Sequence, residues 1–194
     1  AIADLGTYTS SANTLTLGGN VQPSGSWGST VSSADNKSIT YFGSSASGIL
    51  NVNTTTCATG QWLGASSTDW FNASNWCGGV PTSATNVTII SGVPNQPTIN
   101  AMGAVCNNIT INSGATLTIN GSNTLAVSGN WTNNGTYTAN TSTINFNGTA
   151  QSISGATTFN NLTLSNSGVK TLTTVPTVNG ILSMEGTATV SVAP

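Results

Sequence analysis

Short runs in which apolar and polar residues alternate recur along the chain. In each run the apolar side chains stand two positions apart and a small or polar residue lies between them, as in Ile109-Thr110-Ile111 and Leu117-Thr118-Ile119. This period of two predicts β-strands with one buried side and one solvent-facing side. Turn-forming Asn, Ser and Gly residues separate the runs, and no window of helical length carries an apolar stripe at helical spacing. The pattern therefore predicts an all-β fold.

The spacing of the runs favours one all-β architecture. The apolar pairs begin at Ile109, Leu117 and Leu125, eight residues apart. Three strand-and-turn segments of this size would make a coil of roughly 24 residues, which suits one turn of a three-sided β-helix. We therefore expect a right-handed parallel β-solenoid with a continuous column of inward aliphatic side chains. A β-sandwich is the alternative, because hairpins also give short strands at regular spacing, although most runs here are short for sandwich strands.

A long-range repeat suggests how the chain is divided. Residues 11–20 and 121–130 share Asn, Thr, Leu, Gly and Asn at equivalent positions, and a Gly-and-aromatic turn follows each copy. We interpret residues 1–56 as the β-rich tail of a preceding repeat unit, and residues 107–194 as solenoid coils. Between them, residues 57–106 form a Trp-rich opening segment braced by a disulfide. The chain ends without a polar cap, so we expect it to be part of a longer array or a polymer subunit.

The composition excludes several classes of partner. Thr, Ser, Asn and Gly make up more than half of the chain, while charged residues make up only 3%. Two lysines and no arginine cannot neutralise a run of phosphates, so binding to nucleic acid or to an anionic membrane surface is not expected. No apolar run approaches the roughly 20 residues of a membrane-spanning helix. A hydrophobic content of 37% argues against a disordered tail.

The three cysteines indicate a disulfide and an oxidising, extracellular setting. An odd number leaves one thiol free or paired with another molecule. We expect the pair Cys77–Cys106, which closes a loop of moderate length, and the rival pair is Cys57–Cys77, which brackets the Trp-rich stretch. A zinc site is not expected, because the sequence has no CxxC pair and no histidine.

Catalysis is not expected either. The absence of histidine removes Ser-His-Asp and Cys-His arrangements. The four acidic residues are widely scattered, so neither a pair of catalytic carboxylates nor a calcium site is indicated. We predict no enzyme activity, no metal and no cofactor. The acidic residues are Asp4, Asp35, Asp69 and Glu185.

Two sets of side chains are candidates for a binding surface. Trp62, Trp70 and Trp76 form an aromatic cluster that either plugs the apolar end of the coil stack or stacks on sugar rings of a polysaccharide. Threonines at alternate positions could present a flat array of hydroxyls of the kind found in ice-binding solenoids, or they are simply the outward residues that β-strands favour. These threonines include Thr110, Thr116, Thr118, Thr136 and Thr138.

Several stretches of the sequence resemble a known class of protein. Residues 62–76, with the sequence WLGASSTDWFNASNW, followed by Gly79-Val80-Pro81-Thr82, resemble the opening of modules in giant secreted proteins of Bacteroidetes-type bacteria. Residues 108–119 and 129–136 are similar to the solenoid repeats of the same proteins. The resemblance covers residues 57–194 well and implies a tandem cell-surface protein exported by the type IX route.

These observations lead to one functional expectation and one alternative. We expect a secreted structural module of a stalk or filament that associates with copies of itself, end to end or laterally, through β-strand edges. The alternative is a glycan-binding adhesin that uses Trp62, Trp70 and Trp76.

Overall fold

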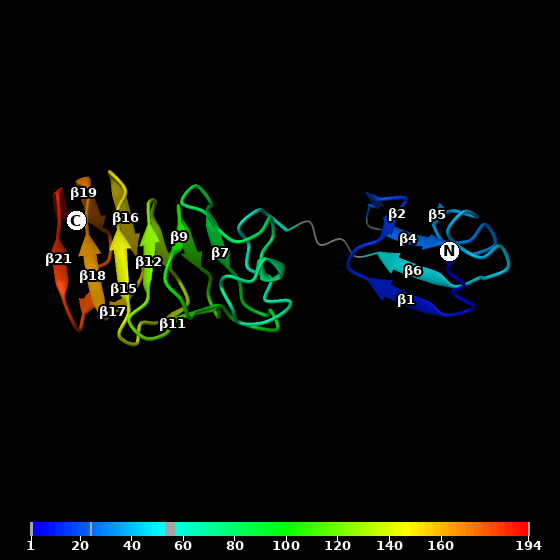
Figure 1. Ribbon diagram of the computed structural model, residues 1–194, viewed down its shortest axis with the longest axis horizontal. Helices are drawn as coiled ribbons and strands as arrows, with labels where there is room; N and C mark the ends of the chain where they lie inside the picture. Colours follow the sequence, from blue (N-terminus) through cyan, green and yellow to red (C-terminus); the bar gives the residue numbers. More distant parts are fainter. Residues whose placement is uncertain (1, 24, 53–56, 194) are drawn as a thin grey trace. The chain divides into compact units, whose positions relative to one another are not determined.

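The chain forms two compact β-rich units, residues 1–56 and 57–194 (Figure 1). The computed structural model describes residues 2–23, 25–52 and 57–193. Within these residues the helical structure is a single 3-10 turn, η1 (Ala73–Asn75), and the rest is strands, turns and loops. The predicted all-β class is confirmed.

Residues 57–194 form a parallel β-solenoid. Its strands repeat in threes along the chain and stack in register on the equivalent strands of the neighbouring coils, giving about five turns (Figure 1). Every strand pair between β7 and β22 is parallel. This arrangement confirms the predicted solenoid and excludes the sandwich, whose sheets would be antiparallel.

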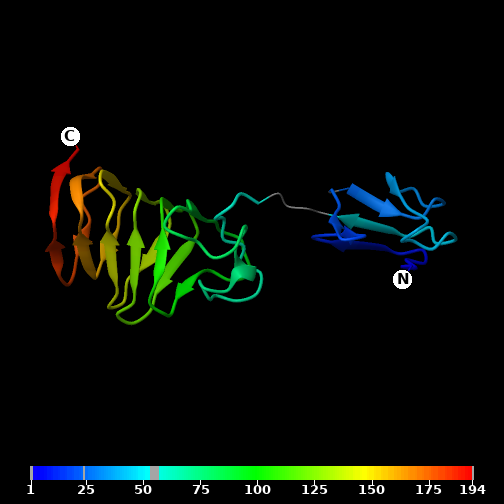
Figure 2. The same cartoon turned by 45° about the horizontal axis from the view of Figure 1, so that its top comes forward.

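The solenoid has three faces. The first face contains β7 (Val87–Ile89), β10 (Ile109–Ile111), β13 (Trp131–Asn133), β16 (Gln151–Ser154), β19 (Ser167–Leu172) and β22 (Thr187–Val192). The second face contains β8 (Thr98–Ile99), β11 (Thr116–Ile119) and β14 (Thr136–Thr138), and then the pair β17 (Thr158–Phe159) and β20 (Thr177–Val178). The third face contains β9 (Ala104–Cys106), β12 (Thr124–Val127), β15 (Thr143–Phe146), β18 (Asn161–Leu164) and β21 (Leu182–Met184). The turned view shows the same stack of coils (Figure 2).

The coils are shorter than the sequence spacing predicts. Ile109 pairs with Trp131, 22 residues later, and Ile144 pairs with Leu162, 18 residues later. The expected coil of roughly 24 residues is therefore wrong. The spacing of eight residues holds from β10 to β11 and from β11 to β12. The turn from β12 to β13 contains only three residues, so the third side of the coil is shorter than eight residues.

The alternating pattern places one side chain of every pair inside the solenoid. In β10, β11 and β12 the apolar residues are buried and the residues between them are partly exposed. Each inward position continues a column through successive coils, as in Val87, Ile109, Trp131 and Ile153. At Trp131 the column includes an aromatic cluster, in which the Trp131 ring packs edge-on against the rings of Tyr137, Phe146 and Phe159.

Asparagine side chains join the coils at their corners. The Asn86 Oδ1 atom accepts a hydrogen bond of 2.8 Å from Asn108 Nδ2, and the Asn108 Oδ1 atom accepts one of 2.7 Å from the Asn130 backbone N–H. A second ladder runs through Asn100 and Asn120, with a distance of 2.7 Å between their side chains. These bonds satisfy backbone and side-chain groups that the strand ladder leaves unpaired.

Residues 1–56 have a different topology. Four strands form a mixed sheet in the order β1 (Thr9–Ala12), β6 (Ile49–Val52), β4 (Gly25–Gly28) and β5 (Asn36–Lys37), with a separate small core that includes Trp27 and Phe42. The strands β2 (Thr16–Leu17) and β3 (Asn20–Val21) form an antiparallel hairpin. The two similar segments 11–20 and 121–130 therefore adopt different structures, since the second contains the parallel strand β12.

Candidate functional site

The Trp-rich segment covers the first coil of the solenoid. Residues 57–86, which we call the Trp cap, precede β7 in the chain. The Trp62 backbone N–H donates to the Thr88 carbonyl at 2.9 Å, and the Trp70 N–H donates to the Thr98 carbonyl at 3.1 Å. Trp62 therefore lies against β7 and Trp70 against β8, so the Trp cap continues the backbone ladder of two faces.

The three tryptophans form one interlocked cluster in the core. The Trp76 ring lies edge-on to Trp62 at 4.8 Å and to Trp70 at 4.7 Å between ring centroids. Trp62 and Trp70 are 0% exposed and Trp76 is 4% exposed. The Trp62 Nε1–H donates to the Asn95 carbonyl, and the Trp76 Nε1–H donates to the Trp70 carbonyl, each at 2.6 Å.

This burial corrects the glycan-binding interpretation of Trp62, Trp70 and Trp76. Stacking on a sugar needs an exposed ring face, and none of these three rings offers one. The physical reason is that a stack of coils ends in an apolar cross-section, and large flat side chains remove it from water. The alternative in which the cluster plugs the column describes the structure.

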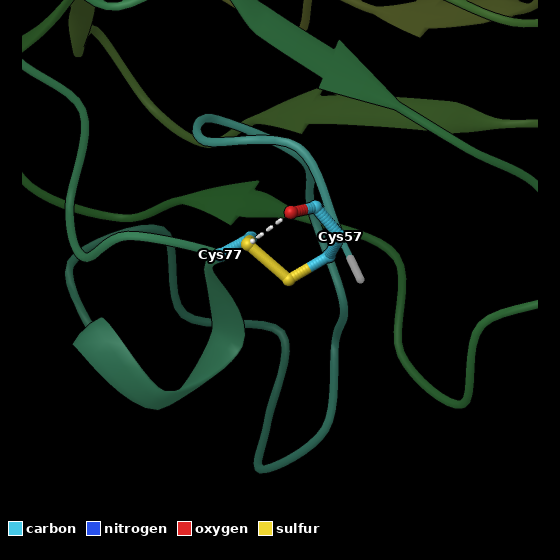
Figure 3. The surroundings of a disulfide bond; sticks show 2 residues. All are labelled: Cys57 and Cys77. Atoms are coloured by element: carbon cyan, nitrogen blue, oxygen red, sulfur yellow. Dashed lines mark hydrogen bonds between the residues drawn. A yellow bond between two sulfur atoms is a disulfide. The ribbon is translucent and has the colours of Figure 1, made fainter. Parts of the chain in front are cut away.

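The disulfide joins Cys57 and Cys77, so the predicted pair Cys77–Cys106 is wrong. The sulfur atoms are 2.08 Å apart and the Cα atoms 5.8 Å apart. The bond ties the start of the Trp cap to the residue that follows η1 and Trp76 (Figure 3). Cys106 is a free thiol at an inward position of β9, and it is 0% exposed. Burial raises the pKa of the Cys106 thiol to about 12, so this thiol is protonated and unreactive at neutral pH.

The acidic side chains hold local turns. The Asp4 Oδ1 atom accepts from the Gly6 N–H at 2.8 Å, and the Asp69 Oδ1 atom accepts from the Phe71 N–H at 3.0 Å. Asp35 accepts from the Ser26 hydroxyl, and Glu185 accepts from the Ser183 hydroxyl. In the described ranges 2–23, 25–52 and 57–193, no three His, Cys, Asp or Glu side chains gather as a metal site would require. The same ranges contain no helix with the length and apolarity to cross a membrane.

The sequence pattern did not predict that Lys170 is buried. Lys170 is 0% exposed, and its ammonium group donates to Gln151 Oε1 at 2.9 Å and to the Gly148 carbonyl. Gln151 in turn donates to the carbonyls of Val127 and Gly129. Burial lowers the pKa of Lys170 below its ordinary value. The available signal in the sequence was its spacing of two residues from Leu172, which places both side chains on the same side of the strand.

The Lys170–Gln151 pair has a structural use. Both side chains take inward positions at the corner where the third face turns into the first, and both direct their donors at backbone carbonyls. Buried carbonyls without donors would destabilise this corner, because water cannot reach them. The pair therefore replaces water as the hydrogen-bond donor inside the coil.

The last coil exposes its inward apolar side chains. Leu182, Met184, Val190 and Val192 are 43–58% exposed. In the register Leu182 and Met184 follow the buried Leu162 and Leu164, Val190 follows the buried Lys170, and Val192 follows the partly buried Leu172. We call these four side chains, with the outer edges of β21 and β22, the open coil end. It presents an apolar surface and unpaired backbone groups together.

Residues 1–56 contain a separate apolar hollow. It has a volume of about 350 Å³ and its lining is mostly aliphatic, with Leu5, Leu15, Leu17 and Leu50 among the lining residues. No charged side chain lines it. It offers little to orient a polar ligand, since a specific site adds a few convergent polar groups to its apolar lining.

Together, the stacked parallel coils, the buried column and the Trp cap define a capped β-solenoid, a repeat protein in which each coil packs on its neighbours. Residues 61–179 match the family described as a domain of unknown function, DUF8693, and the chain belongs to this family. The match begins within the Trp cap and ends in the turn after β20. No curated protein and no solved structure matches the chain.

Proposed function

We propose that this protein is a non-catalytic structural module of an extracellular stalk or filament, and that copies of it associate through the open coil end. The observation that carries the proposal is the open coil end itself. Its apolar side chains and its strand edges lie in the register of the coils before them, so a matching strand can extend both the ladder and the column.

The chemistry of the chain supports an extracellular setting. The Cys57–Cys77 disulfide is of the kind that persists in oxidising compartments. The near absence of charge lets neighbouring copies approach without repulsion. The resemblance of residues 62–76 to the openings of modules in giant secreted proteins of Bacteroidetes-type bacteria supports export and a place in a tandem cell-surface array.

The two ends of the solenoid differ in what they offer a second copy. The Trp cap occupies the ladder positions next to β7 and β8 and buries the apolar cross-section there. The open coil end has no such cover among the described residues. A strand from a second copy can therefore add at the open coil end, whereas the Trp cap offers no equivalent apolar surface.

The assembly is tested by sedimentation velocity across a concentration series, with electron microscopy of the same samples. We expect the chain of residues 1–194 to self-associate, and we expect Val190→Lys with Val192→Lys to keep it monomeric, because two ammonium groups would be desolvated at the contact. The matched control is Met102→Lys, at an apolar side chain that is 82% exposed in the loop before β9.

The outcomes are distinguishable. Association that Met102→Lys retains and the double variant loses supports the open coil end as the contact. A chain that stays monomeric at every concentration contradicts the proposal. Association that the double variant retains places the contact elsewhere and also contradicts it. Circular dichroism of each variant shows whether the solenoid is intact.

A further inference from the structure

The second face of the solenoid carries an ordered array of threonines. Outward side chains of β8, β11, β14, β17 and β20 carry the pattern Thr-x-Thr or a single Thr, and we call this set the Thr face. Two columns run across the coils: Thr116 pairs with Thr136, and Thr118 pairs with Thr98 and Thr138. The Thr face consists of Thr98, Thr116, Thr118, Thr136, Thr138, Thr158 and Thr177.

Two further threonines stand on β17 and β20, which form a separate two-stranded sheet. Thr158 pairs with Thr177, and the inward neighbours of these strands, Tyr137 and Phe159, pack with their ring centroids 5.8 Å apart. Beneath the Thr face the inward residues Leu117 and Ile119 are completely buried. The five threonines of β8, β11 and β14 therefore stand on a rigid support across three coils.

The Thr hydroxyls are not used inside the protein. Within the described part of the chain, none of the seven hydroxyl groups takes part in a hydrogen bond with a protein atom. The first face differs, because it carries one outward threonine column, Thr88, Thr110 and Thr132, instead of two, and the Ser154 hydroxyl donates to Thr132. The third face is also less regular, since Val105 and Ala126 interrupt its outward column.

The spacing of the array is fixed by the backbone. Neighbouring strands lie about 4.8 Å apart, and alternate residues along one strand lie about 6.6 Å apart. Each lattice point of the Thr face carries one hydroxyl and one methyl group. The strands β8, β11, β14, β17 and β20 contain no charged residue, so no ammonium or carboxylate group disturbs the water next to them.

We propose that the Thr face binds ice. Its hydroxyls stand at regular intervals in two columns, so they can take the places of lattice waters while the methyl groups lie in the gaps between them. The free hydroxyls bind that water without breaking an internal bond, and bridging water is nearly as favourable as a direct hydrogen bond. Because the support is rigid, little conformational entropy is lost on binding.

A polysaccharide fits this surface less well. Sugar rings are bound through stacking on exposed aromatic rings, and the aromatic residues of the second face, Tyr137 and Phe159, point inward. The three tryptophans of the cap are buried as well. What remains is a lattice of hydroxyl and methyl groups, which matches a lattice of water molecules.

The test uses the intact chain of residues 1–194. Thermal hysteresis and the shaping of single ice crystals are measured for the unchanged protein, for Thr138→Lys combined with Thr158→Lys, and for Thr163→Lys. Thr163 is a partly exposed outward residue of β18 on the third face and serves as the matched control. We expect hysteresis and faceted crystals from the unchanged protein and the control, and loss of both from the double variant.

A conservative variant separates the hydroxyl from the shape of the face. Thr138→Val keeps the branched side chain and the strand preference, so it shows how much of the effect depends on the hydroxyl. Circular dichroism and thermal unfolding establish that each variant is folded. Absence of hysteresis and of crystal shaping in the unchanged protein overturns the proposal. Equal loss in Thr163→Lys also overturns it, and so does binding to an insoluble polysaccharide, without ice shaping, that the double variant abolishes.

Discussion

At the scale of single residues, the inward positions of the coils decide which side chains are chemically available. An alternating strand turns one side chain inward at every second residue, whatever its chemistry. Cys106, Trp131 and Lys170 all occupy such positions and are completely buried. At the surface, a thiol, an indole or an ammonium group could react or bind a ligand. Inside the column, these three groups are part of the core.

The buried thiol predicts how stability depends on pH. The pKa of Cys106 is raised from 9.0 to about 12 in the folded chain, so between these values the unfolded chain loses a proton that the folded chain retains. Stability is therefore full below pH 9 and falls as the pH rises above it. Cys106 alone should lower the free energy of unfolding by about 1.4 kcal/mol between pH 8 and pH 10.

Urea unfolding at pH 8 and pH 10 checks this prediction. The control is Cys106→Ala, which removes the titrating group. Its baseline stability is lower because the substitution leaves a cavity, but its decline with pH should be smaller than that of the unchanged protein. An equal decline in both proteins would show that Cys106 does not titrate on unfolding.

At the scale of elements, side-chain ladders fix the coils against one another. The strands contain only three to six residues on most faces, so each backbone ladder is short. The side chain of Asn108 extends it by bonding to one coil through Nδ2 and to the next coil through Oδ1. The corner at Asn108 is thereby tied to the coils on both sides.

This role predicts a measurable loss when Asn108 is removed. Asn108→Ala deletes the bonds to Asn86 and to the Asn130 N–H and should destabilise the solenoid by about 1 to 2 kcal/mol. Asn134→Ala, at an exposed asparagine in the turn after β13, should change stability by less than about 0.5 kcal/mol. Thermal unfolding of both variants compares them, and similar losses would mean that the ladder contributes little.

The elements also show what can be predicted from the sequence. Alternation in segments such as Leu117-Thr118-Ile119 is enough to predict an all-β solenoid, because inward and outward positions differ in polarity. The predicted coil length was wrong. A coil has three corners, and the spacing of eight residues was measured across only two of them. The disulfide was wrong because loop length does not reveal that Cys106 points inward, although Ala104 and Cys106 already stand at alternate positions.

The site was harder to predict than the fold. Tryptophan is consistent with both a plug and a platform, and only burial distinguishes the two for Trp62, Trp70 and Trp76. The alternating threonines were visible in the sequence. Their alignment across coils was not, because the register of Thr118 with Thr98 and Thr138 depends on the turns between them.

At the scale of the whole molecule, the chain is built from two units with separate cores. The core of residues 1–56 contains Trp27, Phe42 and Val52, and the core of the solenoid begins at Trp62. The Trp cap covers the apolar cross-section of the first coil. The solenoid therefore does not need the preceding unit to cover its apolar cross-section.

This independence predicts that residues 57–194 fold alone. We expect their amide resonances to coincide with those of the same residues in the full chain, and we expect their thermal midpoint to stay within a few degrees, since a change of about 1 kcal/mol shifts the midpoint by about 2 to 8 °C. Two-dimensional NMR and calorimetry measure both. Broad shifts throughout the Trp cap would show that residues 1–56 complete the fold.

The position of the disulfide has a mechanical consequence. If the solenoid is pulled along its chain, a coil that ruptures unfolds and its residues extend. The Cys57–Cys77 bond spans 20 residues, and these stay tied together whatever happens to the fold around them. The disulfide therefore prevents an extension of about 70 Å within the Trp cap. Among the described coils that follow the Trp cap no disulfide restrains the chain, so a coil that ruptures there can extend over its full length.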